Sequence, residues 1–208
     1  MQRRGFSRIE LLLVVAVTGV VAAMLLPVLA QNGDDVRERE NARQMQCLSN
    51  LKQIGLALRM YSQDYDQIDY PPAAIHGESY GWALAFQPYL KSREIFECPN
   101  ERNPRNDNPR EAGYTDYWYN LNLANVGEGR LWHQARTIMF GDGDGRYTAS
   151  NARYAINYLP KSWLNTDGSP ARRHVDGANY AFADGHVKWY LPARINGGKA
   201  SDPTFKLK

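Results

Sequence analysis

The sequence predicts an α+β protein in which a long N-terminal helix, transmembrane in its first half, packs on a C-terminal head built around an antiparallel sheet. Three observations support this prediction. Residues 11–30 carry no charge, and apolar side chains recur at helical steps between residues 47 and 65. Residues 178–191 alternate around Asp184-Gly185 in the manner of a two-stranded hairpin.

The uncharged run at residues 11–30 has about the length that a helix needs to cross a bilayer core. Glu10 lies directly before it, and a carboxylate at this depth is costly without a partner. Pro27 removes one helical hydrogen bond and should bend or loosen the helix. The alternative is a plain single-span anchor in which Glu10 only sits at the membrane interface.

The first thirty residues carry a resemblance to a known family. The stretch GFSRIELLLVVAVTGVVAAMLLPVLA resembles the N-terminal signal of type IV pilins and type II secretion pseudopilins, with Glu10 where that family has its near-universal Glu. The resemblance implies that a prepilin peptidase cleaves after Gly5 and methylates the new amine of Phe6. Glu10 of one subunit would then pair with the Phe6 amine of a neighbour, since a buried unpaired charge costs several kcal/mol.

Four segments follow from these observations. They are a leader at residues 1–5, a transmembrane and assembly helix at 6–30, an amphipathic helix at 31–70 and a globular head at 71–208. Residues 31–35 (QNGDD) leave the continuity of the helix at Gly33 open, and Pro71-Pro72 should end it. The apolar stripe of the second helical segment comprises Cys47, Leu51, Ile54, Leu58, Tyr61 and Tyr65.

Strands are expected in the head at residues 114–122, 136–140 and 178–191. A two-residue type I′ turn at Asp184-Gly185 pairs Phe182 with Val187 and puts both side chains on one face of the hairpin. By the same register, that face also carries Tyr180, Trp189, Ala178 and Leu191. His186, Lys188, Asn179 and Tyr190 occupy the other face.

The head also resembles a bacterial pilin-like subfamily. The resemblance rests on CLSNLKQIGLALRMYSQDYD, on WALAFQPYLKSREIFEC, and on His174 followed after nine residues by Asp184-Gly185, a processing-associated motif of that subfamily. His174 and Asp184 could be a ligand pair or an acid and a base. We favour structural roles, with Asp184 serving its turn, because no nucleophile with a supporting base accompanies them.

Two further sets of residues are candidate sites. Cys47 and Cys98 can form a disulfide if the head lies outside the cytoplasm, and two buried thiols that never meet are the alternative. Asp142 and Asp144 in GDGDG resemble the start of a calcium loop, which Asp184 or Asp176 could complete, although no Glu closes an EF-hand. A Gly-rich turn without calcium is the alternative.

The balance of basic and acidic side chains argues against a nucleic-acid partner. Without Arg3 and Arg4 the chain carries 23 basic and 22 acidic side chains, and the basic ones are scattered.

The resemblance implies a structural subunit without enzymatic activity, in a type IV pilus-like filament or a type II secretion pseudopilus. Its expected partners are copies of itself, the prepilin peptidase, assembly-platform proteins and, before assembly, membrane lipid. It would be stored in the inner membrane with its head outside the cytoplasm, then reach the periplasm or the cell exterior. The alternative is a membrane-anchored extracytoplasmic module that binds carbohydrate or another surface. An enzyme using His174 and Asp184 is a third, weaker interpretation.

Overall fold

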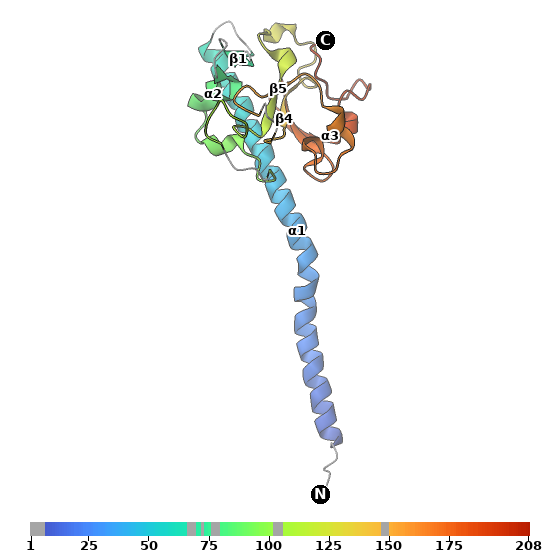
Figure 1. Cartoon of the computed structure of the whole chain (residues 1–208). Coiled ribbons are helices and arrows are strands. Elements are labelled where there is room, and N and C mark those ends of the chain that lie inside the picture. The colour runs from blue at the N-terminus through green and yellow to red at the C-terminus, as the bar shows by residue number, and fades with distance from the viewer. Residues whose placement is uncertain (1–6, 66–69, 72, 76–79, 102–105, 147–149) are drawn as a thin grey trace. The chain divides into compact units, whose positions relative to one another are not determined.

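The computed structural model describes residues 7–65, 70–71, 73–75, 80–101, 106–146 and 150–208, without the side chains of residues 25–34, 74, 75, 80 and 128. The chain forms two compact units, Met1–Asn41 and Ala42–Lys208. Helix α1 (Arg8–Asp64) contributes residues to both units (Figure 1). Its helical hydrogen bonding continues through Gly33, where the sequence left continuity open.

The described apolar side chains of the first unit are exposed. Within the residues that the structure describes, no helix combines the length and apolar character needed to cross a membrane. This finding overturns the predicted transmembrane half of the helix.

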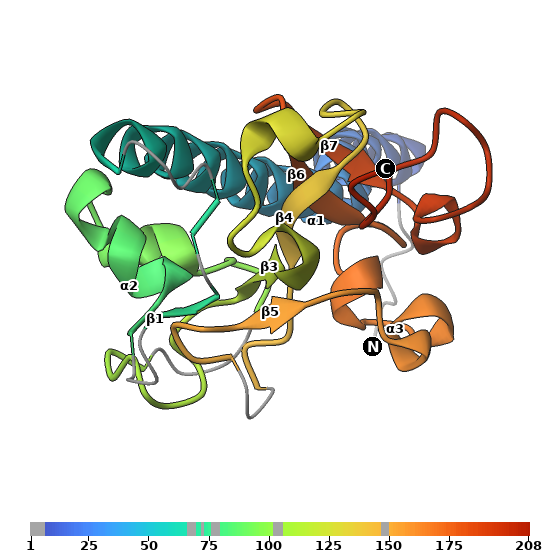
Figure 2. The same cartoon turned by 90° about the horizontal axis from the view of Figure 1, so that it is seen from above.

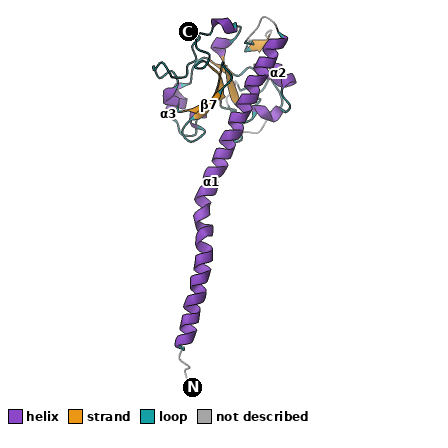
Figure 3. Ribbon diagram, turned by 180° about the vertical axis from the view of Figure 1, so that it is seen from behind, coloured by secondary structure: helices purple, strands orange, loops and turns teal. Residues whose placement is uncertain are grey.

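The second unit consists of short elements joined by longer loops (Figure 3). After α1 the helices and strands are β1 (Ala74–Ile75), β2 (Tyr80–Gly81), α2 (Trp82–Phe86), β3 (Tyr117–Asn120), β4 (Ile138–Asp142), β5 (Ala155–Ile156), α3 (Lys161–Asn165), β6 (Ala178–Phe182) and β7 (Val187–Tyr190). Single 3₁₀ turns connect them at Gln87–Tyr89, Arg93–Phe96, Leu121–Leu123, Glu128–Arg130, Pro170–Arg172 and Pro192–Arg194. The predicted strands at 114–122 and 136–140 correspond to β3 and β4.

The main sheet is mixed, so the predicted antiparallel sheet is wrong at one edge. Its strand order is β5-β3-β4-β6-β7, and β5 runs parallel to β3 with Tyr119 opposite Ala155. The other pairs are antiparallel. The chain crosses from β4 to the far side of β3 before it forms β5. The sequence did not predict β5, because a strand of two residues is too short to show an alternating pattern.

The hairpin of β6 and β7 differs from its predicted register by one residue. Ala181, not Phe182, lies opposite Val187, and the connection is a three-residue loop at residues 183–185. Gly185 takes the positive φ of 89° that such a loop requires. Because a one-residue slip reverses the faces of a strand, Phe182 and Val187 lie on opposite faces of the sheet.

Apolar clusters cover both faces of this sheet, with α2 and α3 on opposite sides (Figure 2). Residues of α1 and α2 pack on one face, against small side chains of β6 such as Ala181. Large rings, among them Trp118, Tyr180 and Phe182, fill the other face together with partly buried side chains of α3. The small side chains let α1 approach the sheet closely.

The predicted stripe places α1 on the sheet. The first five of its residues, Cys47 to Tyr61, are buried, as expected. Tyr65 is 52% exposed because the helix ends at Asp64, before the proline pair is reached. Buried Cys47 thereby faces the centre of the head.

Candidate functional site

A disulfide joins Cys47 and Cys98 in the interior of the head. The stripe of α1 presents Cys47, and Cys98 follows the 3₁₀ turn at Arg93–Phe96, whose N-cap is Ser92. The backbone N–H of Cys98 donates to Asp116 Oδ2 over 2.8 Å. Both cysteines are buried, so the bond ties α1 to this loop without contact with solvent.

His174 is presented by a tight turn and is fully buried. His174 and Gly177 exchange two backbone hydrogen bonds of 2.8 and 3.2 Å. Val175 and Asp176 between them have φ angles of 49° and 63°, as a type I′ turn requires at both central positions. Trp189 Nε1 donates to the carbonyl of His174 over 2.7 Å, which connects the turn to β7.

Asp142 ends β4, and its buried carboxylate points into the same interior. Its Oδ2 accepts a 2.7 Å hydrogen bond from the backbone N–H of Asn179 on the neighbouring β6. Its Oδ1 is buried and has no hydrogen-bond partner among the residues that the structure describes. A buried carboxylate oxygen in that state is energetically costly, which marks the position as unusual.

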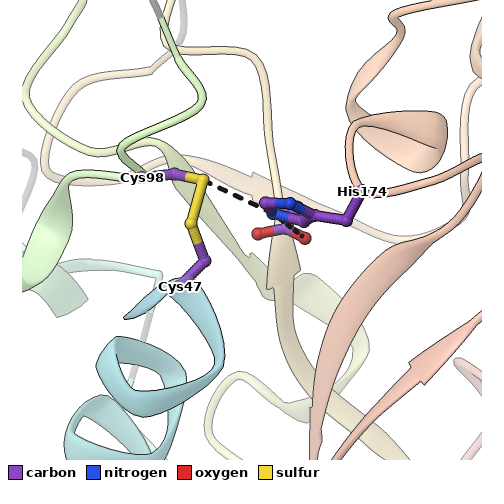
Figure 4. A group of neighbouring side chains, drawn as sticks. Cys47, Cys98 and His174 are labelled. Atoms are coloured by element: carbon purple, nitrogen blue, oxygen red, sulfur yellow. Dashed lines mark hydrogen bonds and ion pairs between the residues drawn. A yellow bond between two sulfur atoms is a disulfide. The ribbon is translucent and has the colours of Figure 1, made fainter. Parts of the chain in front are cut away.

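These side chains form one cluster, which we call the Cys–His–Asp cluster: Cys47, Cys98, Asp142 and His174. His174 Nε2 lies 3.5 Å from Cys98 Sγ and 3.4 Å from Asp142 Oδ2. One ligand-type atom from each residue lies within 4.8 Å of the other three. The imidazole points towards the disulfide, with Cys47 on the helix and Cys98 on the loop (Figure 4).

Polar and charged groups surround the cluster. Asn100 Nδ2 lies 3.3 Å from His174 Nδ1 and orients the ring. Arg173 forms a buried ion pair with Glu101 and donates to the carbonyl of Gly143. Burial raises the pKa of Asp116 to about 7, although the hydrogen bond from Cys98 and the charge of Arg173 act to lower it.

The predicted N-terminal site is described only at Glu10. Gly5 and Phe6, the residues expected at the cleavage point, lie outside the described residues. Glu10 lies in the first turn of α1, where its Oε2 accepts a 2.8 Å hydrogen bond from the backbone N–H of Ser7. Ser7 Oγ in turn accepts from the backbone N–H of Ile9, so the two side chains cap the helix.

The two halves of the His-x9-Asp-Gly motif have different surroundings. Asp184 lies in the β6–β7 loop, where its Oδ1 contacts His186 Nδ1 at 2.6 Å and accepts from the backbone of His186 at 3.1 Å. His174 instead faces Asp142 and the disulfide. Gly185 contributes its positive φ to the loop.

The two residues of the predicted calcium loop also have different partners. Asp142 faces His174, whereas Asp144 accepts a 2.9 Å hydrogen bond from the backbone of Arg146 and pairs with its guanidinium. Calcium binding stays a prediction. Sequence reasoning missed Asn100, Asp116 and Arg173 as neighbours of the cluster, and nothing in their spacing indicates it.

A second feature of the head is a hollow of about 400 Å³ near the C-terminus. Its lining is rich in basic side chains: His133, Arg136, Lys199, Lys206 and Lys208. Trp132 lies beside the C-terminal residues, since its backbone N–H donates to the carbonyl of Leu207. Its side chain is 67% exposed, and Lys208 Nζ lies 5.4 Å from its ring centroid. The carboxylate-bearing Asp202 also lines the hollow.

Comparison with known proteins places part of the chain in context. Residues 37–126 match a family model, SBP_bac_10, described as a protein of unknown function (DUF1559). That family is typically associated with prepilin-like proteins. The matched segment contains both cysteines but ends before Asp142 and His174. No curated protein and no solved structure matched the chain.

Proposed function

We propose that the chain is a pilin-like structural subunit that assembles with copies of itself at the cell surface. The observation that carries this proposal is the exposed apolar surface of the first unit. Large apolar side chains there are between 50% and 74% exposed: Ile9, Leu11, Leu12, Leu13, Val14, Val15, Val17, Val20, Val21 and Met24. A continuous apolar surface of this kind needs a covering partner in water.

The family match supports the same proposal, since a prepilin-like association fits a surface protein. In the proposed pathway a prepilin peptidase removes residues 1–5, and the apolar helices of neighbouring subunits then cover one another. Glu10 and the new amine of Phe6 set the register between subunits. A filament of the pilus or pseudopilus type is the expected product, and no chemical reaction belongs to the proposal.

A second apolar surface on α1 supports contacts between heads. Met45, Leu56 and Met60 are 61%, 53% and 47% exposed, and they lie on the helix face opposite the buried stripe. They are eleven and four residues apart, close to three turns and one turn, so they share one face. Burying such side chains contributes roughly 25 cal/mol per Å².

The test is assembly of the full chain in its native cells. Leu56→Glu should abolish sheared, high-molecular-mass filaments without unfolding the head, because the added charge would be buried between subunits. Leu121→Glu is the matched control, since Leu121 is 45% exposed and lies outside α1. Equal filament yields from the two variants would contradict the proposal.

Glu10 is tested separately, because its proposed partner is a neighbour's N-terminus. Glu10→Ala should stop assembly and leave the thermal unfolding of the head unchanged, and Glu38→Ala serves as the control on the same helix. Mass spectrometry of the mature protein should show a chain that begins at Phe6 and carries one extra methyl group. Recovery of a chain with Met1 still attached, as single copies, would count against the whole pathway.

A second candidate function is binding of an anionic glycan at the basic hollow. Lysine and arginine side chains supply the charge, and the exposed ring of Trp132 offers a face on which a sugar can stack. Lys206→Glu should weaken binding of a sulfated polysaccharide at least about tenfold, whereas Lys161→Glu, at an exposed position of α3, should not. Equal binding of neutral and sulfated polysaccharides would contradict this candidate.

A further inference from the structure

The Cys–His–Asp cluster contains four side chains of the types that hold transition-metal ions. All four residues are buried, and their ligand-type atoms lie within 4.8 Å of one another. We propose that the cluster binds a zinc-class divalent cation when the Cys47–Cys98 disulfide is reduced. Metal binding and the disulfide are then two mutually exclusive states of one site, and the proposal does not depend on assembly.

The distances within the cluster fit a tetrahedral site. Zinc bonds of about 2.0 Å to nitrogen or oxygen and about 2.3 Å to sulfur place neighbouring ligand atoms about 3.3 to 3.8 Å apart. His174 Nε2 already lies 3.4 Å from Asp142 Oδ2 and 3.5 Å from Cys98 Sγ. The two sulfurs have to separate, and breaking the bond between them permits that movement.

A second, independent observation is the buried carboxylate of Asp142. Its Oδ1 has no hydrogen-bond partner among the described residues, although the side chain is fully buried. A divalent cation that the carboxylate binds through both oxygens would satisfy Oδ1 as well as contact Oδ2, the oxygen that lies 3.4 Å from His174 Nε2. The carboxylate and the two thiolates formed on reduction would together balance the charge of the ion.

Neighbouring residues also fix the position of His174, as a metal ligand requires. Asn100 contacts Nδ1 of His174 at 3.3 Å, which leaves Nε2 directed at the cluster. The atom that faces Nδ1 in the structure is the amide nitrogen Nδ2. Rotating the Asn100 amide by 180° puts its oxygen in that place, where it accepts the Nδ1 proton, and Nε2 then presents its lone pair to the metal. Trp189 fixes the backbone of His174 through its indole N–H.

The chemistry of the ligands selects the class of metal. Two thiolates, one imidazole and one carboxylate suit zinc and cobalt, whereas calcium needs six to eight oxygen ligands. An external dithiol transfers two electrons and two protons to the disulfide, which becomes two thiols, and the dithiol becomes a disulfide. The metal ion then displaces the two thiol protons.

The experiment titrates the full-length protein with Co²⁺, after reduction by a phosphine and in the oxidised form. The reduced protein should bind one Co²⁺ per chain with the visible absorption of a tetrahedral, thiolate-ligated site, and Zn²⁺ should displace it. The oxidised protein should show none of this absorption. No stoichiometric binding after reduction, or the same binding in both forms, would overturn the proposal.

Variants assign the ligands. Asp142→Asn and His174→Gln should each weaken binding at least about tenfold. Asp184→Asn, at the exposed loop contact with His186, should leave it unchanged. If the reduced, metal-free chain unfolds, one equivalent of Zn²⁺ should restore its far-UV circular dichroism. Absence of that recovery, or unchanged affinity in both ligand variants, would also refute the site.

Discussion

The Nε2 atom of His174 lies 3.4 Å from the Oδ2 atom of Asp142, and neither side chain is exposed to solvent. Asp142 ends β4, whereas His174 begins the tight turn before β6. The sheet therefore brings together two residues that are 32 positions apart in the sequence. The histidine of the His-x9-Asp-Gly motif acts inside the head, and the aspartate of the motif acts at an exposed loop.

Replacing His174 with alanine should lower the free energy of unfolding by about 2–4 kcal/mol, because it leaves a cavity and removes a neighbour of the buried Asp142 carboxylate. Urea denaturation of the oxidised protein measures the change. His133→Ala is the control, since His133 is exposed and should change stability by less than about 0.5 kcal/mol. Similar losses in the two variants would contradict the structural importance of His174.

Removing the disulfide in the Cys47→Ala, Cys98→Ala double variant should lower the free energy of unfolding by about 4 kcal/mol. The bond joins residues 51 positions apart, so it restricts the unfolded chain strongly. Chemical denaturation of the variant and of the oxidised protein under identical conditions gives the difference. Coincident denaturation curves would show that the bond does not form in the folded protein.

The buried Asp116 should make stability depend on pH. Its pKa is about 7 in the folded head and near 3.8 when unfolded, so the folded state holds the proton more tightly. Its contribution is fully present below pH 3.8 and is lost as the pH rises through about 7.

Asp116→Asn keeps an acceptor for the N–H of Cys98 but cannot ionise. Relative to the parent protein, it should therefore gain on the order of 3 kcal/mol in unfolding free energy between about pH 4 and about pH 8. Denaturant unfolding at several pH values measures this difference, in which other titrating groups cancel. A difference that stays constant with pH would refute the raised pKa.

Gly141 in β4 should not tolerate a side chain. A Cβ atom at this position would overlap the buried rings of Trp118 and Tyr180. Gly141→Ala should therefore destabilise the head by about 1–3 kcal/mol or more. Gly129→Ala is the matched control, because a Cβ atom added there would meet nothing within 4 Å. Thermal unfolding of both variants decides the point, and equal melting temperatures would argue against the close packing.

Local patterns in the sequence account for much of the head. The steps of three and four residues correctly predicted five buried side chains of α1 between Cys47 and Tyr61, although Asn50 and Ala57 are buried as well. The strand patterns located β3, β4 and the β6–β7 hairpin. The helix stripe and these strands can be predicted from the sequence because residues close together in the chain determine them.

Other features depend on contacts between distant segments. The one-residue difference in the hairpin arises because Ala181 must face α1 while the large ring of Phe182 fills the opposite face. The two-residue strand β5 exists only through its pairing with β3. The predicted transmembrane half of α1 was wrong: among the residues that the structure describes, no helix is both long enough and apolar enough to cross a membrane.

The sequence by itself determined the buried stripe of α1, the main strands and the loop position of Asp184-Gly185, because periodicity and turn chemistry are local. The tertiary structure alone decided that Asp142 meets His174 beside the Cys47–Cys98 disulfide, and that β5 joins the sheet in parallel. These contacts between distant segments depend on how the helix, the loops and the sheet pack together. The spacing of residues along the chain does not indicate which of them come into contact.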